Sequence, residues 1–216
     1  MRPRSRVRRR VPANVEREIL GLGDRRGSHY LASLLEAADD FDHERDRRAL
    51  RTLRELRDAL PDSPSIRELL GLTHYRLGNF RAAAKELEAF IELSGSVEQH
   101  PVLMDCYRAQ HRWAKVEQLW QELAAASPSG QLVAEGRIVA AGALADRGRV
   151  TEAVSLLSRK ADAVKRPREH HLRLWYALAD LEERAGDHAR ARALFARVAA
   201  HDPQFADVSD RQAALG

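Results

Sequence analysis

The sequence predicts an all-α protein built from about five helix-turn-helix repeats. One pattern of small and large apolar residues returns roughly every 34 residues, and glycine and proline occupy fixed places in it. No segment shows the strict alternation of apolar and polar residues that is typical of a β-strand. The chain has 216 residues, 44% of them hydrophobic, which is enough for an ordinary packed core.

The last repeat, residues 172–203, carries the pattern most completely. Its sequence, LRLWYALADLEERAGDHARARALFARVAAHDP, places a small residue on each of two helices, a glycine between the helices and a proline after them. Small residues let two helices approach closely, while large residues fill the space above and below them. The defining positions are Trp175, Leu178, Ala179, Gly186, Ala191, Phe195 and Pro203.

The same frame fits four earlier segments, so that repeats begin near residues 30, 64, 97, 134 and 172. The steps between these starts are 34, 33, 37 and 38 residues, and the longer two absorb loop insertions. The first repeat is degenerate because its turn holds no glycine, and the fourth has Arg137 where the pattern has an aromatic residue. The small residues predicted between the paired helices also include Gly71, Ala83, Ala141 and Ala153.

Backbone chemistry predicts the helix ends. Gly78, Gly148 and Gly186 fall at the end of a first helix, where a residue in the left-handed conformation terminates the helix at little cost. Proline lacks the amide N–H that would continue a helix, and prolines follow three of the second helices. They are Pro61, Pro128 and Pro203.

The ends of the chain depart from the repeat. After the last repeat, Phe205, Val208 and Leu215 lie on one apolar stripe, which predicts a helix that seals the open hydrophobic end of the array. Along the chain we expect a disordered Arg-rich arm at 1–11, a short helix and Gly-rich linker at 12–29, the repeats at 30–205 and the capping helix at 205–216.

The net positive charge lies entirely in the arm. Residues 1–11 hold six arginines and no acidic residue, whereas the rest of the chain has 30 basic and 32 acidic side chains. Such an arm either neutralises phosphates without reading sequence or only aids solubility. A second basic cluster, in a predicted loop at 160–173, either contacts phosphates or an acidic partner or is simply solvated. The candidate nucleic-acid contacts are Arg2, Arg4, Arg6, Arg8, Arg9, Arg10, Lys165, Arg166 and Arg168.

Over residues 30–205 the repeated pattern resembles that of the tetratricopeptide repeat family, although Glu182 stands where that family has a tyrosine. The resemblance implies a right-handed α-α superhelix whose concave groove, lined mainly by first helices, binds a partner protein or peptide. It does not imply catalysis. The family's two-carboxylate clamp is not expected, because it needs a set of Lys, Arg and Asn at fixed positions of three successive first helices, and the groove positions here do not carry that set. Those positions are Leu34, Ala38, Phe41, Leu72, Tyr75, Asp105, Arg108, Ile138, Gly142, Tyr176, Asp180 and Glu183.

Six residues on or beside the groove side of the first helices are the best candidates for contact with a partner. The packing pattern does not require them, so we expect charge reversal at Arg108 and Arg184 to abolish partner capture without changing stability. The six are Tyr75, Arg76, Arg108, Tyr176, Asp180 and Arg184.

No cofactor or metal site is predicted. The glycines of residues 21–27 lack the strand and the spacing of a nucleotide-binding loop. The acidic residues of 39–46 lack the Gly and Glu of a calcium loop, which favours a solvated turn. His170 and His171 are adjacent, so we expect them to point to different faces of a helix and not to share a zinc ion.

Catalysis and base stacking are also disfavoured. Cys106 has no identifiable base nearby, and we expect it to be a small buried hydrophobe. The tryptophans at 113, 120 and 175 occupy pattern positions for large core residues, so packing accounts for them better than the stacking of bases.

The sequence therefore predicts a non-catalytic, cytoplasmic scaffold that binds a partner protein or peptide. No apolar run is long enough to span a bilayer. The alternative is an RNA- or ribosome-associated factor that grips phosphates with the arm and the 160–173 loop. Binding of total RNA by the full chain, compared with a chain lacking residues 1–11, distinguishes the two.

Overall fold

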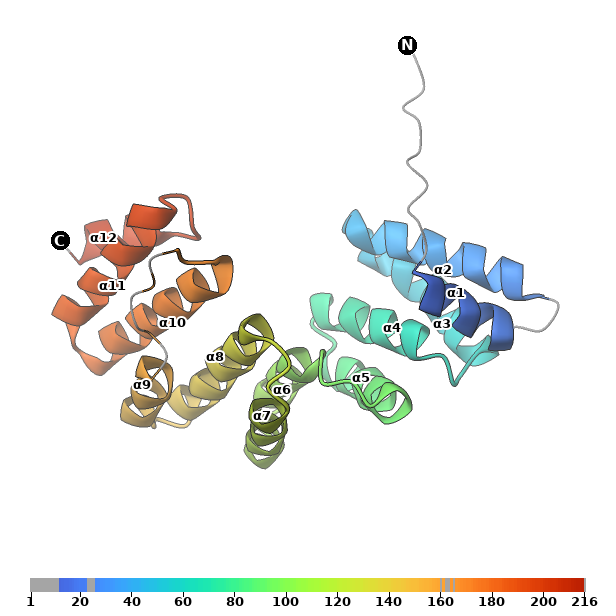
Figure 1. Ribbon diagram of the computed structural model, residues 1–216, viewed down its shortest axis with the longest axis horizontal. Helices are drawn as coiled ribbons and strands as arrows, with labels where there is room; N and C mark the ends of the chain where they lie inside the picture. Colours follow the sequence, from blue (N-terminus) through green and yellow to red (C-terminus); the bar gives the residue numbers. More distant parts are fainter. Residues whose placement is uncertain (1–11, 23–25, 160, 162–163, 165, 216) are drawn as a thin grey trace, which may run out of the picture. The chain divides into compact units, whose positions relative to one another are not determined.

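The computed structural model describes residues 12–22, 26–159, 161, 164 and 166–215. Within these residues the regular secondary structure is helical, with no strand (Figure 1). The helices are α1 (Ala13–Leu22), α2 (Gly27–Asp42), α3 (Asp46–Ala59), α4 (Pro64–Arg76), α5 (Phe80–Ser94), α6 (His100–Ala109), α7 (Trp113–Ala126), α8 (Gly130–Asp146), α9 (Val150–Ser158), α10 (Glu169–Ala185), α11 (His188–His201) and α12 (Val208–Ala214).

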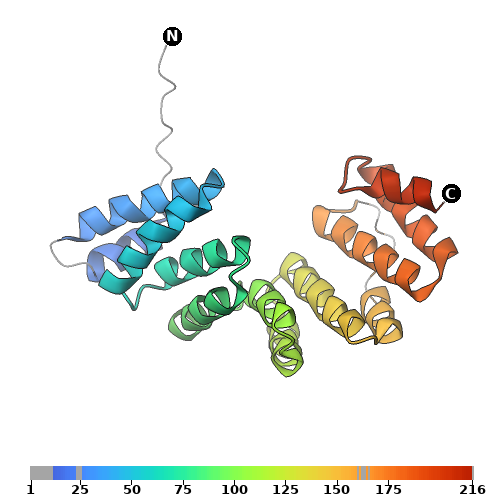
Figure 2. The same cartoon turned by 180° about the vertical axis from the view of Figure 1, so that it is seen from behind.

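Contacts divide the chain into two units, Met1–Gln99 and His100–Gly216. Unit 1 contains α1 and the hairpins α2–α3 and α4–α5, and unit 2 contains the hairpins α6–α7, α8–α9 and α10–α11 followed by α12. Figure 2 shows the same pairs from behind, with α12 against α11. The described residues thus contain the five helix-turn-helix repeats and the terminal helix that the sequence predicts.

Each hairpin turns on one residue in the left-handed conformation. The predicted glycines provide it in three hairpins, while a glutamate and a histidine adopt it in the other two. Successive left-handed residues are separated by 34, 33, 37 and 38 residues, the same steps as the predicted repeat starts. They are Glu44 (φ 58°), Gly78 (φ 72°), His111 (φ 56°), Gly148 (φ 76°) and Gly186 (φ 88°).

One hydrogen bond closes every turn. The N–H of the residue after the left-handed one donates to the carbonyl five residues earlier, as from Asn79 to His74 at 2.9 Å. This bond satisfies a carbonyl that the helix end would otherwise leave without a partner. The residues that accept it hold equivalent positions in the five hairpins. They are Asp40, His74, Tyr107, Leu144 and Glu182.

The predicted small residues lie between the paired helices. The five alanines are fully buried, and Gly71 is buried so closely that an added Cβ would lie 2.7 Å from the side chain of Leu87. The role predicted for these residues is confirmed. The alanines are Ala83, Ala141, Ala153, Ala179 and Ala191.

The residue that accepts the turn hydrogen bond is buried and carries a polar group in four of the five hairpins, whereas the leucine of the fourth hairpin is half-buried. Asp40 is 1% exposed and lies 2.6 Å from Nε of Arg45 and 3.1 Å from Nε of Arg48. Glu182 is 3% exposed and lies 2.9 Å from Arg190. Burial raises the pKa of Glu182, whereas Arg190 opposes this shift. A solvated turn is therefore a wrong prediction for Asp40, because nearby arginines allow its carboxylate to be buried.

Only one of the three tryptophans is a core residue. Trp175 is 1% exposed, whereas Trp113 and Trp120 are half-buried. The prediction of core positions for Trp113 and Trp120 is wrong, because both residues lie on α7 and only one side of that helix packs against the hairpins.

The first and last helices are attached to the hairpins by specific contacts. In unit 1, Ile19 of α1 is fully buried, and the carboxylate of Glu18 accepts hydrogen bonds from Ser63 and Ser65 at the start of α4. In unit 2, Val208 is fully buried and Phe205 packs against the core. These contacts cover apolar ends that a stack of hairpins leaves open.

The left-handed turns predict opposite effects of two substitutions in unit 1. A residue with a side chain at φ > 0 is strained by about 1 kcal/mol, so we expect Glu44→Gly to stabilise unit 1 and Gly78→Ala to destabilise it, each by about that amount. Urea unfolding followed by circular dichroism measures both. Loss of stability in Glu44→Gly would contradict the role of the turn.

His74 predicts a pH dependence of stability. Burial lowers its pKa below the ordinary 6.5, and Arg54 and Arg57 lower it further, against the opposing effect of Glu86. The unfolded chain therefore takes up a proton at higher pH than the folded chain, and stability is lost as the pH falls through about 6.5. We expect His74→Leu, which places here the residue found at the equivalent position 144, to weaken this dependence. Urea unfolding of both proteins at pH values on either side of 6.5 checks it.

Candidate protein-binding surfaces

All six predicted contact residues are at least partly exposed, and they lie on first helices of the hairpins. Arg76 and Arg184 are exposed, and the other four are half-buried. Tyr75 and Arg76 belong to α4 in unit 1, whereas Arg108 on α6 and three residues on α10 belong to unit 2. Most of these side chains also make contacts within their own unit.

Arg76 connects α4 to the preceding hairpin. Its guanidinium lies 3.4 Å from the ring centroid of Phe41, donates to the carbonyl oxygen of Phe41 at 2.5 Å and approaches Asp46 at 3.3 Å. Beside it, the ring of Tyr75 packs edge-on against Phe80. In this part of unit 1, a partner would meet side chains that are already held in place.

Arg108 connects α6 to α8. Its Nε donates to Asp146 at 2.6 Å, and Asp105 lies 3.5 Å away. Gly142 makes this geometry possible, because a Cβ there would lie 2.8 Å from the guanidinium. Arg108 thus forms an ion pair between two hairpins in addition to the partner contact predicted for it, and whether the fold needs this residue stays a prediction.

Tyr176 and Asp180 contact the C-terminal segment. The Tyr176 hydroxyl donates to Asp207, and its ring packs against Phe205. Asp180 accepts a hydrogen bond from Arg211 at 2.9 Å. Burial first, and then the hydrogen bond to Asp207, raises the pKa of Tyr176 to about 12, so the phenol stays neutral. Both predicted contact residues thus help to hold the C-terminal segment.

Arg184 differs from the other predicted contacts. Its side chain is exposed near the end of α10, and among the described residues it makes no hydrogen bond or ion pair. Its charge is available to a partner without breaking an internal contact.

The candidate nucleic-acid contacts are only partly within the described residues. Arg166 and Arg168 are exposed, and Arg168 immediately precedes α10. The predicted loop at 160–173 is too long, because α10 begins at Glu169. Arg173 therefore lies in a helix, where it pairs with Glu169 and Glu135. The remaining candidates, Arg2, Arg4, Arg6, Arg8, Arg9, Arg10 and Lys165, lie outside the described residues.

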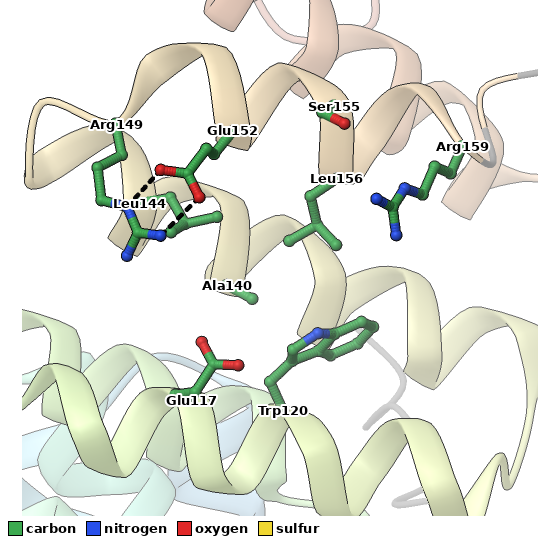
Figure 3. Close-up of a pocket in the computed structure, with 9 residues that line it drawn as sticks. All are labelled: Glu117, Trp120, Ala140, Leu144, Arg149, Glu152, Ser155, Leu156 and Arg159. Carbon is green, nitrogen blue, oxygen red and sulfur yellow. Dashed lines mark hydrogen bonds and ion pairs between the residues drawn. The ribbon is translucent and has the colours of Figure 1, made fainter.

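A cleft that the sequence does not predict lies between α7 and α9 in unit 2 (Figure 3). It has a volume of about 310 Å³. Leu156 of α9 points toward Trp120 of α7, with Ala140 of α8 between them. The lining residues, which we call the α7–α9 cleft, are Glu117, Trp120, Ala140, Leu144, Arg149, Glu152, Ser155, Leu156 and Arg159.

The charges of the α7–α9 cleft are separated along its length. At one end Arg149 pairs with Glu152 through two short hydrogen bonds, and Glu117 lies on the facing helix. Arg159 occupies the other end. The sequence signal for this cleft is Arg137, which replaces an aromatic residue in the fourth repeat and lies over Trp120 with 5.1 Å between the guanidinium carbon and the ring centroid.

Metal and thiol chemistry find little support in the described residues. They contain no group of three or more His, Cys, Asp or Glu side chains that could hold a metal ion. The rings of His170 and His171 lie 4.0 Å apart, so the expectation that they point to different faces is wrong. Cys106 is fully buried, as predicted, and burial raises the pKa of its thiol to about 12. The thiol is therefore protonated at neutral pH and a poor nucleophile.

Comparisons with known proteins find helical repeats of the same kind in two segments of the chain. Two family models, both described as tetratricopeptide repeat, match residues 34–97 and 172–215. The sequence matches none of the curated proteins. No helix within the described part of the chain has the length and apolar character needed to cross a membrane.

Solved structures show the same fold at low identity. A thermophilic tetratricopeptide repeat protein of Thermus thermophilus is 19% identical, and the similarity covers 86% of this chain and 98% of that chain with a TM-score of 0.64. The C-terminal part of a repeat-containing protein of Cytophaga hutchinsonii is 14% identical, covering 84% and 69% with a TM-score of 0.62. The pilF protein of Pseudomonas aeruginosa is 12% identical, covering 89% and 90% with a TM-score of 0.60. The predicted fold class is confirmed.

The ion pair between Arg108 and Asp146 predicts a measurable coupling. Both side chains are about one-third exposed, so we expect a double-mutant cycle of Arg108→Ala and Asp146→Ala to give roughly 0.5–1 kcal/mol. Urea unfolding of the four proteins measures it. Arg184→Ala is the matched control and should change stability by less than about 0.5 kcal/mol. A coupling of zero would support the expectation that Arg108 is dispensable.

Proposed function

Because the chain belongs to the tetratricopeptide repeat family, whose repeats support a general role as protein-interaction scaffolds, we propose that it binds a partner protein or peptide along the first helices of its hairpins. In this proposal the protein is not an enzyme and supplies a surface only. The observation that supports it best is the exposure of polar and aromatic side chains on those helices.

The internal contacts divide the candidate residues into two kinds. Arg76, Arg108 and Asp180 are held by neighbouring helices or turns, so they would offer a partner fixed groups at a small entropic cost. Arg184 is exposed and would pair with an acidic group of the partner. A surface that combines side chains held in place with an exposed charge favours specific binding over nonspecific association.

An RNA- or ribosome-associated role is the second candidate. It is supported by the exposure of Arg166 and Arg168 and by the six arginines of residues 1–11. Such binding would weaken steeply with salt, because it depends on the release of counterions from phosphates.

Affinity capture from the native lysate tests the first proposal. We expect the full chain to retain a defined protein both with and without nuclease treatment, identified by mass spectrometry. Tyr75→Ala combined with Arg184→Gln should reduce its recovery about tenfold, the loss expected of roughly 1.4 kcal/mol.

The control for this experiment is Arg192→Gln, which removes an exposed arginine from α11. Equal recovery by the Tyr75 and Arg184 double variant and by the control would remove the first helices from the proposal. Recovery only without nuclease, abolished by replacing the six arginines of residues 1–11, would favour the RNA role.

A further inference from the structure

The α7–α9 cleft has an apolar centre made by three helices. Trp120 on α7, Leu144 on α8 and Leu156 on α9 line it, and Trp120 is half-buried, not packed in the core. Figure 3 shows the indole facing Leu156 across the cleft. The volume of about 310 Å³ is close to the lower end of ligand-binding pockets, roughly 300 Å³, and suits one large side chain with its neighbours.

Two arginines beside Trp120 have no acidic partner among the described residues. Arg137 stacks on Trp120 and donates to the carbonyl oxygen of Leu156 at 3.4 Å, and Arg159 forms the nearby end of the cleft. Burial lowers the pKa of Arg137, and the charge of Arg159 lowers it further. Other arginines of unit 2, such as Arg108 and Arg149, are paired with carboxylates. An added carboxylate would offset this concentration of positive charge.

The opposite end of the cleft limits the kind of anion that fits. Glu117 and Glu152 line that end together with Arg149, and the charge of Arg147 also acts on Glu152. A nucleic-acid backbone would place phosphates along the whole cleft and meet these carboxylates. A peptide can place a single carboxylate at the Arg159 end and an uncharged or basic part at the other.

From these observations we propose that the α7–α9 cleft is a second docking site, separate from the first helices, for a peptide segment that carries an apolar side chain next to a carboxylate. The apolar side chain packs against Trp120, Leu144 and Leu156. The carboxylate pairs with Arg159, while Arg137 beside Trp120 adds to the positive charge at this end, and the charge gradient of the cleft sets the direction of the peptide.

Selection from a displayed library of random short peptides tests the proposal on the full chain. We expect enriched peptides to contain Leu or Phe beside Asp or Glu. In fluorescence anisotropy, synthetic versions should bind about tenfold or more weakly to Arg159→Gln, because a hydrogen-bonded charge pair is lost. Amidating the peptide's acidic residue should cause a similar loss for the original protein and little further loss for Arg159→Gln.

Matched variants separate binding from folding. Arg192→Gln removes an exposed arginine of α11 and should bind as the original protein does. Trp120→Ala should also weaken binding; if it unfolds, as judged by circular dichroism, the exposed Arg159 still decides the question. Enriched peptides without an acidic residue, equal binding to Arg159→Gln, or no enrichment would overturn the proposal. Arg159-dependent competition by an oligouridine would replace it with nucleic-acid binding. Lysate partners retained by Arg159→Gln would leave the first-helix proposal standing.

Discussion

The closing of each hairpin on one left-handed residue is the constraint on which the rest of the structure depends. The same hydrogen bond closes all five turns, from Asp40–Arg45 to Glu182–Asp187. Because the turn sets where the second helix begins, it also sets which residues of the two helices face each other. A strained Glu44 or His111 is accepted at this position, since losing the turn would cost the packing of both helices.

The residue that accepts the turn hydrogen bond shows how the hairpins differ. Where this side chain is buried and carries a charge, an opposite charge lies nearby. In the first and last hairpins the acids Asp40 and Glu182 each pair with an arginine eight residues later. In the fourth hairpin the residue is Leu144, and position 152 holds a glutamate that pairs with Arg149. No arginine covers Leu144 from that position, and Leu144 lines the α7–α9 cleft.

The surfaces proposed for partner binding also differ in whether their charged side chains are paired within the fold. Three residues each connect their own first helix to a neighbouring hairpin or to the C-terminal segment: Arg76 on α4, Arg108 on α6 and Asp180 on α10. In the proposed binding to the first helices, the same residues would therefore serve both stability and recognition. In the α7–α9 cleft, Arg159 has no acidic partner among the described residues and Trp120 is half-buried. Using these two side chains to bind a peptide would therefore take little from the stability of the fold.

Sequence alone determined the features that repeat. The period, the turn glycines and the small residues between helices, such as Ala83 and Ala191, depend on local backbone conformation and on the spacing within one hairpin. Contacts between hairpins were decided only by the tertiary structure. The partner of Arg108 is Asp146, 38 residues away, and its reach depends on the absence of a side chain at Gly142. The burial of Asp40, the exposure of Trp120 and the α7–α9 cleft likewise depend on which faces of neighbouring helices meet, and a periodic pattern does not specify this.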